Sequence, residues 1–441
     1  MILFLGKNYN DLDRIVPLID YMSKISEEEI VLCLGHSAYK ANNDFRISYL
    51  RRTHNLKIID FYRDPPLGYL KVVLKDFGTR WSYWTPNRRF QDNIYSGVKS
   101  LFGVEVMHKL IRAMRVGCQR LDEWFYGFDY AKKYLTRLNP SVIVSDDRPR
   151  PRSIFKAAHN LGIPVIGVPH GVNIAEIVQS DYLVSSDSLD DSDFTSTHTF
   201  YSKLLTTNEN AKKRYKILGV PSDKIIVAGS PRFCPQWREI YSSILPFPKG
   251  NLPVPQPDRV KLVIMDQKST SDMDVEEIYK AVRGIQALGF VDLVVKPSTG
   301  NANISGSLGK NYHATEGIGE LCQIETEEHS CHLIAWADAV IATRSSISLE
   351  VLLQGKTLIH PLYFGTGKNI LERYQALWMV ENFEEMIKAL EILRITPDYR
   401  PYSDSAVEAA INHIVLGDNP KRNVLDTYTC HITSLRNKLA R

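Results

Sequence analysis

The chain has 441 residues, of which 44% are hydrophobic and 24% charged, and its formal net charge at pH 7 is +4. This length allows two ordinary hydrophobic cores and makes a single compact domain the less favoured arrangement. The small charge excess lacks the dense basic footprint of a nucleic-acid-binding protein, so no nucleic-acid partner is expected. The six cysteines lie far apart, without CxxC pairs or zinc-ligand spacing, which predicts a reducing environment and no structural metal.

Short apolar runs rich in Ile, Val and Leu alternate with longer amphipathic stretches through the first half of the chain. Runs of this length and composition are typical of the buried strands of a parallel sheet. The predicted strands are residues 2–6, 29–35, 56–61, 140–147, 163–171, 181–186 and 224–230. The order strand, helix, strand predicts a doubly wound, Rossmann-like α/β domain over residues 1–244.

A segment of different character interrupts this domain at about residues 63–138. Its sequence FGTRWSYWTPNRRF carries Trp81 and Trp84 among arginines, and a long helical stretch follows it. An aromatic and basic surface of this kind suits a sugar chain or a lipid-linked acceptor, so both tryptophans are candidate acceptor-binding residues. The alternative is an insertion whose aromatic side chains simply pack on the N-terminal domain.

A proline-rich stretch divides the chain. Five prolines fall within residues 245–259, where they cannot belong to a helix interior or a central strand, so we predict an interdomain linker there. The alternation of strands and helices then resumes and predicts a second Rossmann-like domain over residues 260–417, followed by a helical tail at 418–441. Its predicted strands are residues 261–266, 292–298, 337–343 and 356–361.

Ligands of open α/β sheets bind outside the carboxyl ends of the strands, so the residues directly after each predicted strand are candidates for a site. In the first half, Asp146 and Asp147 are candidates for a general base, although Asp at the head of a helix is also an ordinary cap. Arg148 and Arg150 follow them and are candidates for acceptor binding. His170 stands before a glycine, where a neutral imidazole could take a proton from an attacking hydroxyl; a structural histidine is the alternative.

Further polar side chains follow the later strands. Ser230 and Arg232 lie in a small loop suited to an anionic ligand, and a tight turn with a solvated arginine is the alternative. A lysine at a strand end can neutralise a phosphate, and an aspartate there can act as a base or a nucleophile. The candidates in the second half are Asp266, Gln267, Lys268, Lys296 and Ser298.

The sequence IATRSSISLEVLLQG places two serines between a strand-like run and a helix-like run. Ser345 and Ser346 are thus expected at a helix N-terminus, whose unpaired N–H groups and dipole favour an anion. An N-cap alone explains one serine. The second serine, together with Arg344 and Glu350, predicts a site for the phosphate of a nucleotide donor.

Taken together, these motifs resemble those of the GT-B glycosyltransferases of bacterial surface polysaccharide biosynthesis. The resemblance rests on GVPHGVN, TTNENAKKRYKILGVPSDKIIVAGSPR, VVKPS and ADAVIATRSSISLEVLLQGKTLIHPLYF, between about residues 140 and 390. The capsule and lipopolysaccharide Kdo transferases and the CDP-glycerol glycerophosphotransferases are the most similar in style. The resemblance implies two Rossmann-like domains facing each other across a cleft, a base at His170 and donor phosphate at Ser345 and Ser346. Where many members have His-Pro, this chain has Lys296 and Pro297, so no histidine role carries over there.

The resemblance also implies an activity. It predicts a glycosyltransferase that moves a sugar from a nucleotide-activated donor, with CMP-Kdo as the best candidate, to a growing lipopolysaccharide, O-antigen or capsule glycan. The N-terminal domain would bind the acceptor, whose hydroxyl His170, Asp146 or Asp147 would activate, unless Asp266 acts as a nucleophile in a double displacement. Three alternatives stay open: a UDP-sugar 2-epimerase, a CDP-polyol phosphotransferase, and a non-catalytic protein of polysaccharide assembly.

The expected partners follow from this scheme. The nucleotide sugar serves as a co-substrate, no cofactor or metal is expected, and the acceptor is a glycan or a lipid-linked glycan. No run of eighteen uncharged apolar residues occurs in the chain, which argues against a transmembrane helix. We therefore expect a cytoplasmic protein that is either soluble or attached only at the surface of the inner face of the inner membrane.

Overall fold

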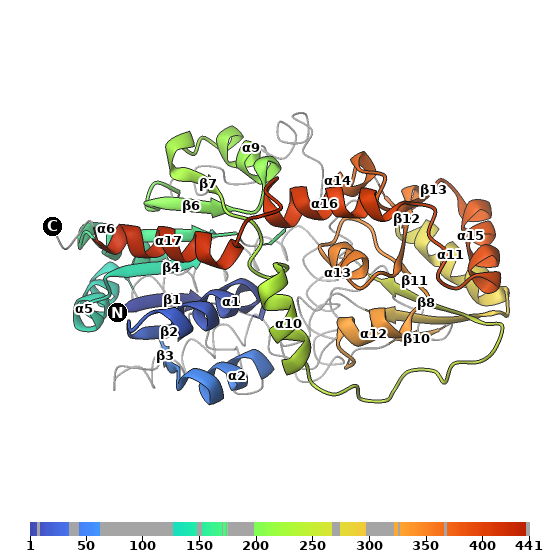
Figure 1. The fold of residues 1–441 in the computed structure, drawn as a ribbon, viewed down its shortest axis with the longest axis horizontal. Helices are drawn as coiled ribbons and strands as arrows, with labels where there is room; N and C mark the ends of the chain where they lie inside the picture. The colour runs from blue at the N-terminus through green and yellow to red at the C-terminus, as the bar shows by residue number, and fades with distance from the viewer. Residues whose placement is uncertain are drawn as a thin grey trace, which may run out of the picture.

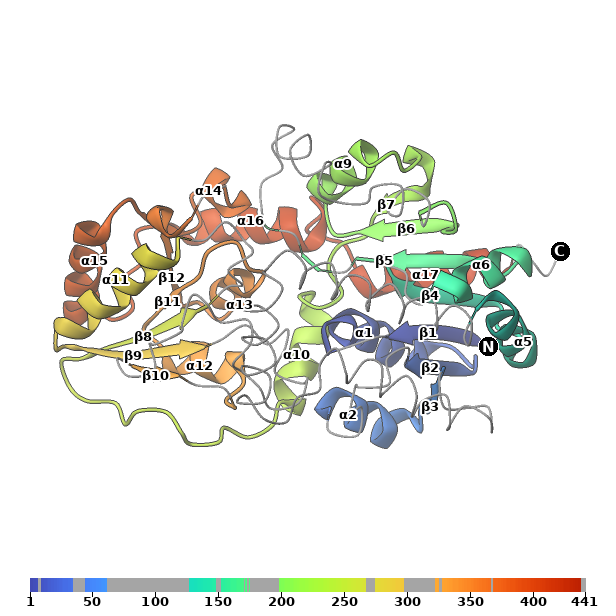
Figure 2. The same ribbon diagram turned by 180° about the vertical axis from the view of Figure 1, so that it is seen from behind.

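The structure is a computed structural model and contains two parallel β-sheets, of seven and six strands (Figure 1). Helices α10 (Pro235–Ile244) and α16 (Asp404–Leu416) lie where the two halves of the molecule meet, as both views show (Figures 1 and 2). The predicted pair of Rossmann-like α/β domains is therefore confirmed. The structure describes residues 1–6, 9–34, 44–61, 127–147, 152–169, 171–172, 174, 198–266, 274–296, 322–324, 327–365 and 368–437.

The N-terminal sheet has the strand order β3-β2-β1-β4-β5-β6-β7, with every neighbouring pair parallel. Its strands are β1 (Ile2–Gly6), β2 (Ile30–Leu34), β3 (Lys57–Asp60), β4 (Val142–Asp146), β5 (Val165–Val168), β6 (Lys203–Thr206) and β7 (Ile225–Val227). Its other elements are α1 (Tyr9–Ile25), α2 (Phe45–His54), α5 (Phe128–Leu138), α6 (Arg152–Asn160), α9 (Glu209–Ile217) and the 3-10 turn η2 (Ser222–Lys224). Strand β6 was not predicted, and the strand predicted at 181–186 lies outside the described residues.

Strands β1, β2 and β5 of this sheet are apolar along their whole length because both of their faces are covered. In β1, Ile2 and Phe4 point into a core shared with α1, whereas Leu3 and Leu5 point into a second core shared with α5 and α6. All five β1 residues are buried. Continuous apolar runs of this kind are what made these strands recognisable in the sequence.

The C-terminal sheet has the order β10-β9-β8-β11-β12-β13, again entirely parallel. Its strands are β8 (Val260–Met265), β9 (Val291–Lys296), β10 (Gln323–Ile324), β11 (Ala339–Ile341), β12 (Thr357–Pro361) and β13 (Trp378–Val380). Its helices and 3-10 turn are α11 (Val275–Ala287), α12 (Ser330–Trp336), α13 (Ile347–Leu353), η5 (Leu362–Phe364), α14 (Ile370–Arg373) and α15 (Phe383–Ile395). The short edge strands β10 and β13 were not predicted.

Each sheet has one point at which the direction of winding reverses. In the N-terminal sheet the reversal lies between β1 and β4, and in the C-terminal sheet between β8 and β11. At such a switch point the two adjacent connections leave on opposite sides of the sheet and open a crevice at the carboxyl ends of the strands. The residues that follow these four strands are therefore the first to examine for a ligand site.

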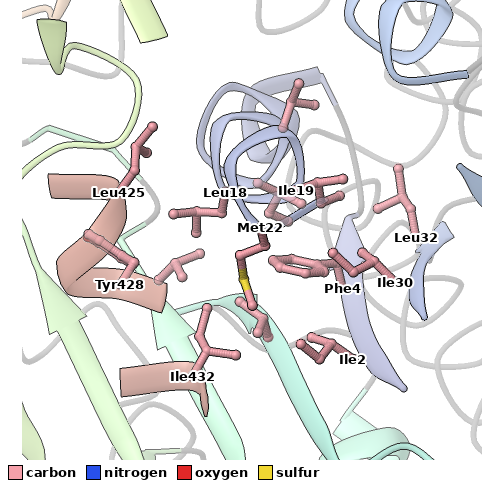
Figure 3. Close-up of a cluster of buried hydrophobic side chains, with 14 of the residues drawn as sticks. Ile2, Phe4, Leu18, Ile19, Met22, Ile30, Leu32, Leu425, Tyr428 and Ile432 are labelled. Atoms are coloured by element: carbon pink, nitrogen blue, oxygen red, sulfur yellow. The ribbon is translucent and has the colours of Figure 1, made fainter. Parts of the chain in front are cut away.

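The chain crosses between the domains twice. Residues 245–259, between α10 and β8, contain no helix or strand. Helix α16 then leads back, and the last helix, α17 (Val424–Asn437), packs against α1 of the N-terminal domain. Figure 3 shows Leu425, Tyr428 and Ile432 of α17 beside Leu18 and Met22 of α1 in one buried cluster. The predicted C-terminal tail is thus built into the N-terminal core.

The return crossing depends on a glycine. Gly229 has a φ of +90°, and a Cβ atom at this position would lie 2.7 Å from the Val415 carbonyl oxygen. We expect Gly229→Ala to lower the free energy of unfolding by about 2 to 4 kcal/mol, because backbone strain and overlap with the last turn of α16 add together. The measurement is urea unfolding.

The matched control is Gly250→Ala. Gly250 has a similar φ of +78°, but a Cβ atom there would meet no atom within 4 Å. This variant should lose only the strain of a left-handed residue, about 1 kcal/mol. Equal losses in the two variants would contradict the role assigned to Gly229 in the crossing.

Candidate functional site

The C-terminal switch point brings together the predicted catalytic residue Asp266 and several predicted donor-binding residues. Asp266 directly follows β8 and is 9% exposed, and its backbone N–H donates to the carbonyl of Lys296 at the end of β9, at 2.9 Å. Arg344, Ser345 and Ser346 follow β11, the strand on the other side of β8, and are partly exposed. The two serines and Asp266 therefore follow the two adjacent strands between which the direction of winding reverses.

The serine pair begins α13 as the sequence predicted, but neither hydroxyl makes a strong cap. Ser346 occupies the N-cap position without a side-chain cap hydrogen bond. The Ser345 hydroxyl accepts a hydrogen bond from the Ile347 N–H at 3.4 Å, which is long for this interaction. Capping thus explains little of the serine pair.

The loop between β11 and α13 is held in place by residues that were not predicted to belong to the site. The Asn369 side-chain amide donates to the Thr343 carbonyl at 3.0 Å, and Asn369 also forms a capping box with Glu372 at the start of α14. His360, at the end of β12, lies 3.2 Å from the Ala342 carbonyl through Nδ1 and 3.4 Å from Glu372 through Nε2. The sequence signal was Asn followed three residues later by Glu, which is typical of a capping box.

Lys296 and Glu350 have protein partners at this edge. The Lys296 ammonium, in a residue only 4% exposed, donates to the Glu328 carbonyl at 2.6 Å. Glu350 accepts a hydrogen bond from the Cys331 thiol at 3.5 Å. Both side chains therefore help to shape the loops around the crevice.

At the N-terminal switch point, Asp146 and Asp147 face opposite sides of the sheet. Asp147 accepts a hydrogen bond from the Tyr215 hydroxyl, and its own N–H donates to the Val168 carbonyl at 2.8 Å. Tyr201 donates to the Asp146 carbonyl at 2.6 Å; burial, and then the two aspartates, raise the pKa of this phenol. Asp147 is thus enclosed among tyrosines.

The Asp146 side chain points to the opposite face of the sheet from the Asp147 side chain. Val142 and Val144 of the same strand belong to the core shared with α1, so alternation along β4 places the Asp146 carboxylate on the α1 side. There it stabilises the charge of Arg14, a residue of α1 that is only 8% exposed. Arg14 was not predicted, although it stands just after the first strand, in GKNYNDLDR.

Comparison with known proteins bears on the fold. No family model and no curated protein matches the chain. Among solved structures, the UDP-GlcNAc 2-epimerase from Neisseria meningitidis bound to UDP-GlcNAc is similar over 99% of both chains, with 11% identity and a TM-score of 0.50. Anabaena Alr3699/HepE in complex with UDP and glucose is similar over 98% of both chains, with 10% identity and a TM-score of 0.52.

The protein has the GT-B fold. Its match to these structures extends over nearly the whole chain, so the two domains and the return of the C-terminal helix belong to one architecture. At 10 to 11% identity, the match describes the fold and leaves the chemistry to be argued from the residues of this chain.

A buried charge network lies where the two GT-B domains meet. Arg46, which is fully buried, donates to Asp13 and forms a two-point contact with Asp44 at 2.6 and 3.0 Å. The predicted donor residue Arg232 pairs with the other oxygen of Asp13 at 2.8 Å. The charges of Asp13 and Arg232 also act on Cys331 of the C-terminal domain, so Arg232 lies at the interdomain boundary. Ser230 is 1% exposed, and its N–H donates to the Val415 carbonyl at 2.8 Å.

His329 joins the two domains through a neutral ring. Its Nδ1 accepts from the Cys331 N–H at 3.2 Å, so the ring hydrogen is on Nε2, which lies 3.2 Å from the Tyr241 hydroxyl of α10. The ring also makes an edge contact with Phe45 of α2. Burial lowers the pKa of His329 to about 4 from its ordinary 6.5.

This lowered pKa predicts a pH dependence of stability. Between pH 6.5 and about 4 the unfolded chain binds a proton that the folded protein excludes, so stability falls as the pH falls through this window. From pH 7 to pH 5 the loss due to His329 should be about 2 kcal/mol. Urea unfolding at both pH values, in wild type and in His329→Gln, measures it: the variant should lose less stability, and equal losses would contradict the assignment.

Several predicted site residues lie outside the described residues, and their roles stay predictions. They are Trp81, Trp84, Arg148, Arg150, His170, Gln267, Lys268 and Ser298. In the part of the chain that the structure describes, no group of three or more His, Cys, Asp or Glu side chains could hold a metal ion. None of the helices there has both the length and the apolar character required to cross a membrane.

Proposed function

We propose that this protein is a nucleotide-sugar-dependent glycosyltransferase with its donor site at the C-terminal switch point and its acceptor site at the N-terminal one. The observation that supports this most is the placement of ionisable and hydroxyl side chains at both switch points. Asp146 and Arg14 lie at one, and Asp266, Ser345 and Ser346 at the other. Group transfer between two ligands requires two such sites close together.

In this proposal the serine loop holds the donor phosphates. Its hydroxyls would stabilise the negative charge that develops on the leaving nucleotide. Asn369 and His360 keep the loop in place through the Thr343 and Ala342 carbonyls. Asp146 would take the proton of the acceptor hydroxyl, because it ends β4 at the switch point and its charge acts on Arg14 there.

The donor nucleotide is proposed to be a uridine diphosphate sugar. The Neisseria structure holds UDP-GlcNAc, and the Anabaena structure holds UDP and glucose. These ligands favour UDP over CMP-Kdo, the donor expected from the sequence resemblance. A surface glycan remains the proposed acceptor.

A UDP-sugar 2-epimerase is the second candidate, because the Neisseria structure of the same fold carries that activity in its name. An epimerase converts its nucleotide sugar without any acceptor, whereas a transferase releases nucleotide in proportion to acceptor consumed. The two reactions therefore differ in what must be added to the assay.

The test is incubation of the protein with UDP-GlcNAc, UDP-glucose and CMP-Kdo, with and without an oligosaccharide acceptor mixture, followed by NMR of the products. Acceptor-dependent release of UDP is the expected result. Conversion of UDP-GlcNAc to its 2-epimer without acceptor would establish the second candidate, and acceptor-dependent release of CMP would restore CMP-Kdo. No turnover of any donor would contradict both enzymatic proposals.

A further inference from the structure

Arg14 is a buried cation that has no ion-pair partner among the described residues. It is 8% exposed, and its Nη1 donates a hydrogen bond to the Asn10 carbonyl at 2.9 Å. Within the described residues no carboxylate lies within ion-pair distance of its guanidinium. The other buried arginine of the domain, Arg46, contacts two aspartates.

A buried charge without an ion-pair partner lowers the stability of the folded protein. Burial lowers the pKa of Arg14, and the charge of Arg232 adds to this, while the charges of Asp13, Asp146 and Asp11 only partly offset the effect. Buried charges are normally paired, because the loss of hydration is otherwise uncompensated. An unpaired guanidinium that persists despite this cost is typical of a site that binds an anion.

The position of Arg14 is that of a ligand contact. It follows β1, beside Asp146 at the end of β4, and these two strands form the N-terminal switch point. Its Nη2 lies 3.0 Å from where a Cβ atom of residue 171 would be, so the glycine after β5 leaves room for the guanidinium. The Nη2 atom of Arg14 thus lies beyond the carboxyl end of β5, where the charge of Asp146 at the end of β4 also acts on the guanidinium.

We propose that Arg14 binds an oxyanion, a carboxylate or a phosphate, carried by the acceptor, so that the enzyme selects acidic acceptor sugars. This rests on the proposed function, which puts the acceptor at this switch point. A guanidinium offers paired donors that match the two oxygens of such a group, and the surrounding burial strengthens the contact. With the oxyanion on Arg14, a neighbouring hydroxyl of the same sugar would reach Asp146.

The experiment compares wild type with Arg14→Met by ligand-observed NMR titration with glucuronic acid, glucose 6-phosphate and glucose at constant ionic strength. Wild type should bind at least one of the two anionic sugars more tightly than glucose. Arg14→Met should weaken that binding by roughly 10- to 100-fold and leave glucose unchanged. Glucuronic acid distinguishes a carboxylate acceptor from the phosphate acceptor represented by glucose 6-phosphate.

Two further measurements separate this role from a structural one. Arg14→Met should unfold at the same or a higher urea concentration than wild type, because it removes an unpaired buried charge. Gly171→Ala should also weaken anionic-sugar binding, because its Cβ atom would crowd Nη2. The proposal is overturned if Arg14→Met is destabilised and still binds the anionic sugars as tightly as wild type does. It is also overturned if wild type binds neither anionic sugar.

Titration of UDP into wild type and into Arg14→Met distinguishes a failure of this inference from a failure of the proposed function. UDP should bind both proteins equally, because its site is on the other domain. If UDP binds neither, the proposed donor site is wrong, while the sugar titrations still test Arg14. If Arg14→Met loses UDP binding and wild type binds neither anionic sugar, Arg14 contacts the donor and the inference is overturned.

Discussion

Replacement of Arg46 by methionine is expected to lower the free energy of unfolding by about 3 to 5 kcal/mol. Arg46 is fully buried, and its guanidinium contacts the carboxylates of Asp13 and Asp44. Asp44 also caps α2 through the backbone N–H groups of Arg46 and Ile47. Methionine fills much of the volume but removes the guanidinium from the buried carboxylates of Asp44 and Asp13.

The control for this prediction lies on the same helix. Arg52 is exposed, so Arg52→Met should change stability by less than about 0.5 kcal/mol. Urea unfolding of the two variants and of wild type gives both values. Similar stabilities for Arg46→Met and Arg52→Met would show that the buried network contributes little to the fold.

Replacement of Asp146 by asparagine should mainly lower kcat, whereas replacement of Asp147 should mainly lower stability. Asp146→Asn is expected to lower kcat by about 10²- to 10⁴-fold, the usual effect of losing a general base. Asp147→Asn should change kcat by less than tenfold and instead lower stability by about 1 to 3 kcal/mol, because the enclosed Asp147 accepts from Tyr215.

Steady-state kinetics with the donor and acceptor found in the product assay, together with urea unfolding, measure both effects. The two variants remove the same charge from adjacent positions of one strand end, so each serves as the control for the other. A larger loss of kcat in Asp147→Asn than in Asp146→Asn would reverse the assignment of the base.

The fold was largely predictable because strands buried on both faces are continuously apolar. β1 and β4 illustrate this, since each alternates its side chains between two cores. The missed strands are short or less apolar: β10 has two residues, β13 has three, and β6 begins at Lys203 and ends at Thr206. The packing of α17 on α1 is a contact across the whole length of the chain, which no local pattern reports.

The site was only partly predictable, for a related reason. The positions of Ser345, Ser346 and Asp266 at strand ends were predictable because residues at strand ends can be identified once the strands are known, and their role stays a prediction. Arg14 and Arg46 stand on helices, and their importance comes from burial, which depends on what packs around them. Likewise, Arg232 pairs with Asp13, which lies 219 positions earlier in the chain.

The central claim is that a nucleotide binds at the C-terminal switch point through the serine loop. Isothermal titration calorimetry of UDP against wild type and Ser345→Ala/Ser346→Ala tests it most directly. We predict one site per chain in wild type and an affinity lower by roughly 10- to 100-fold in the double variant, because two donors to the phosphates are lost. Equal affinities, or no binding of UDP to wild type, would contradict the account.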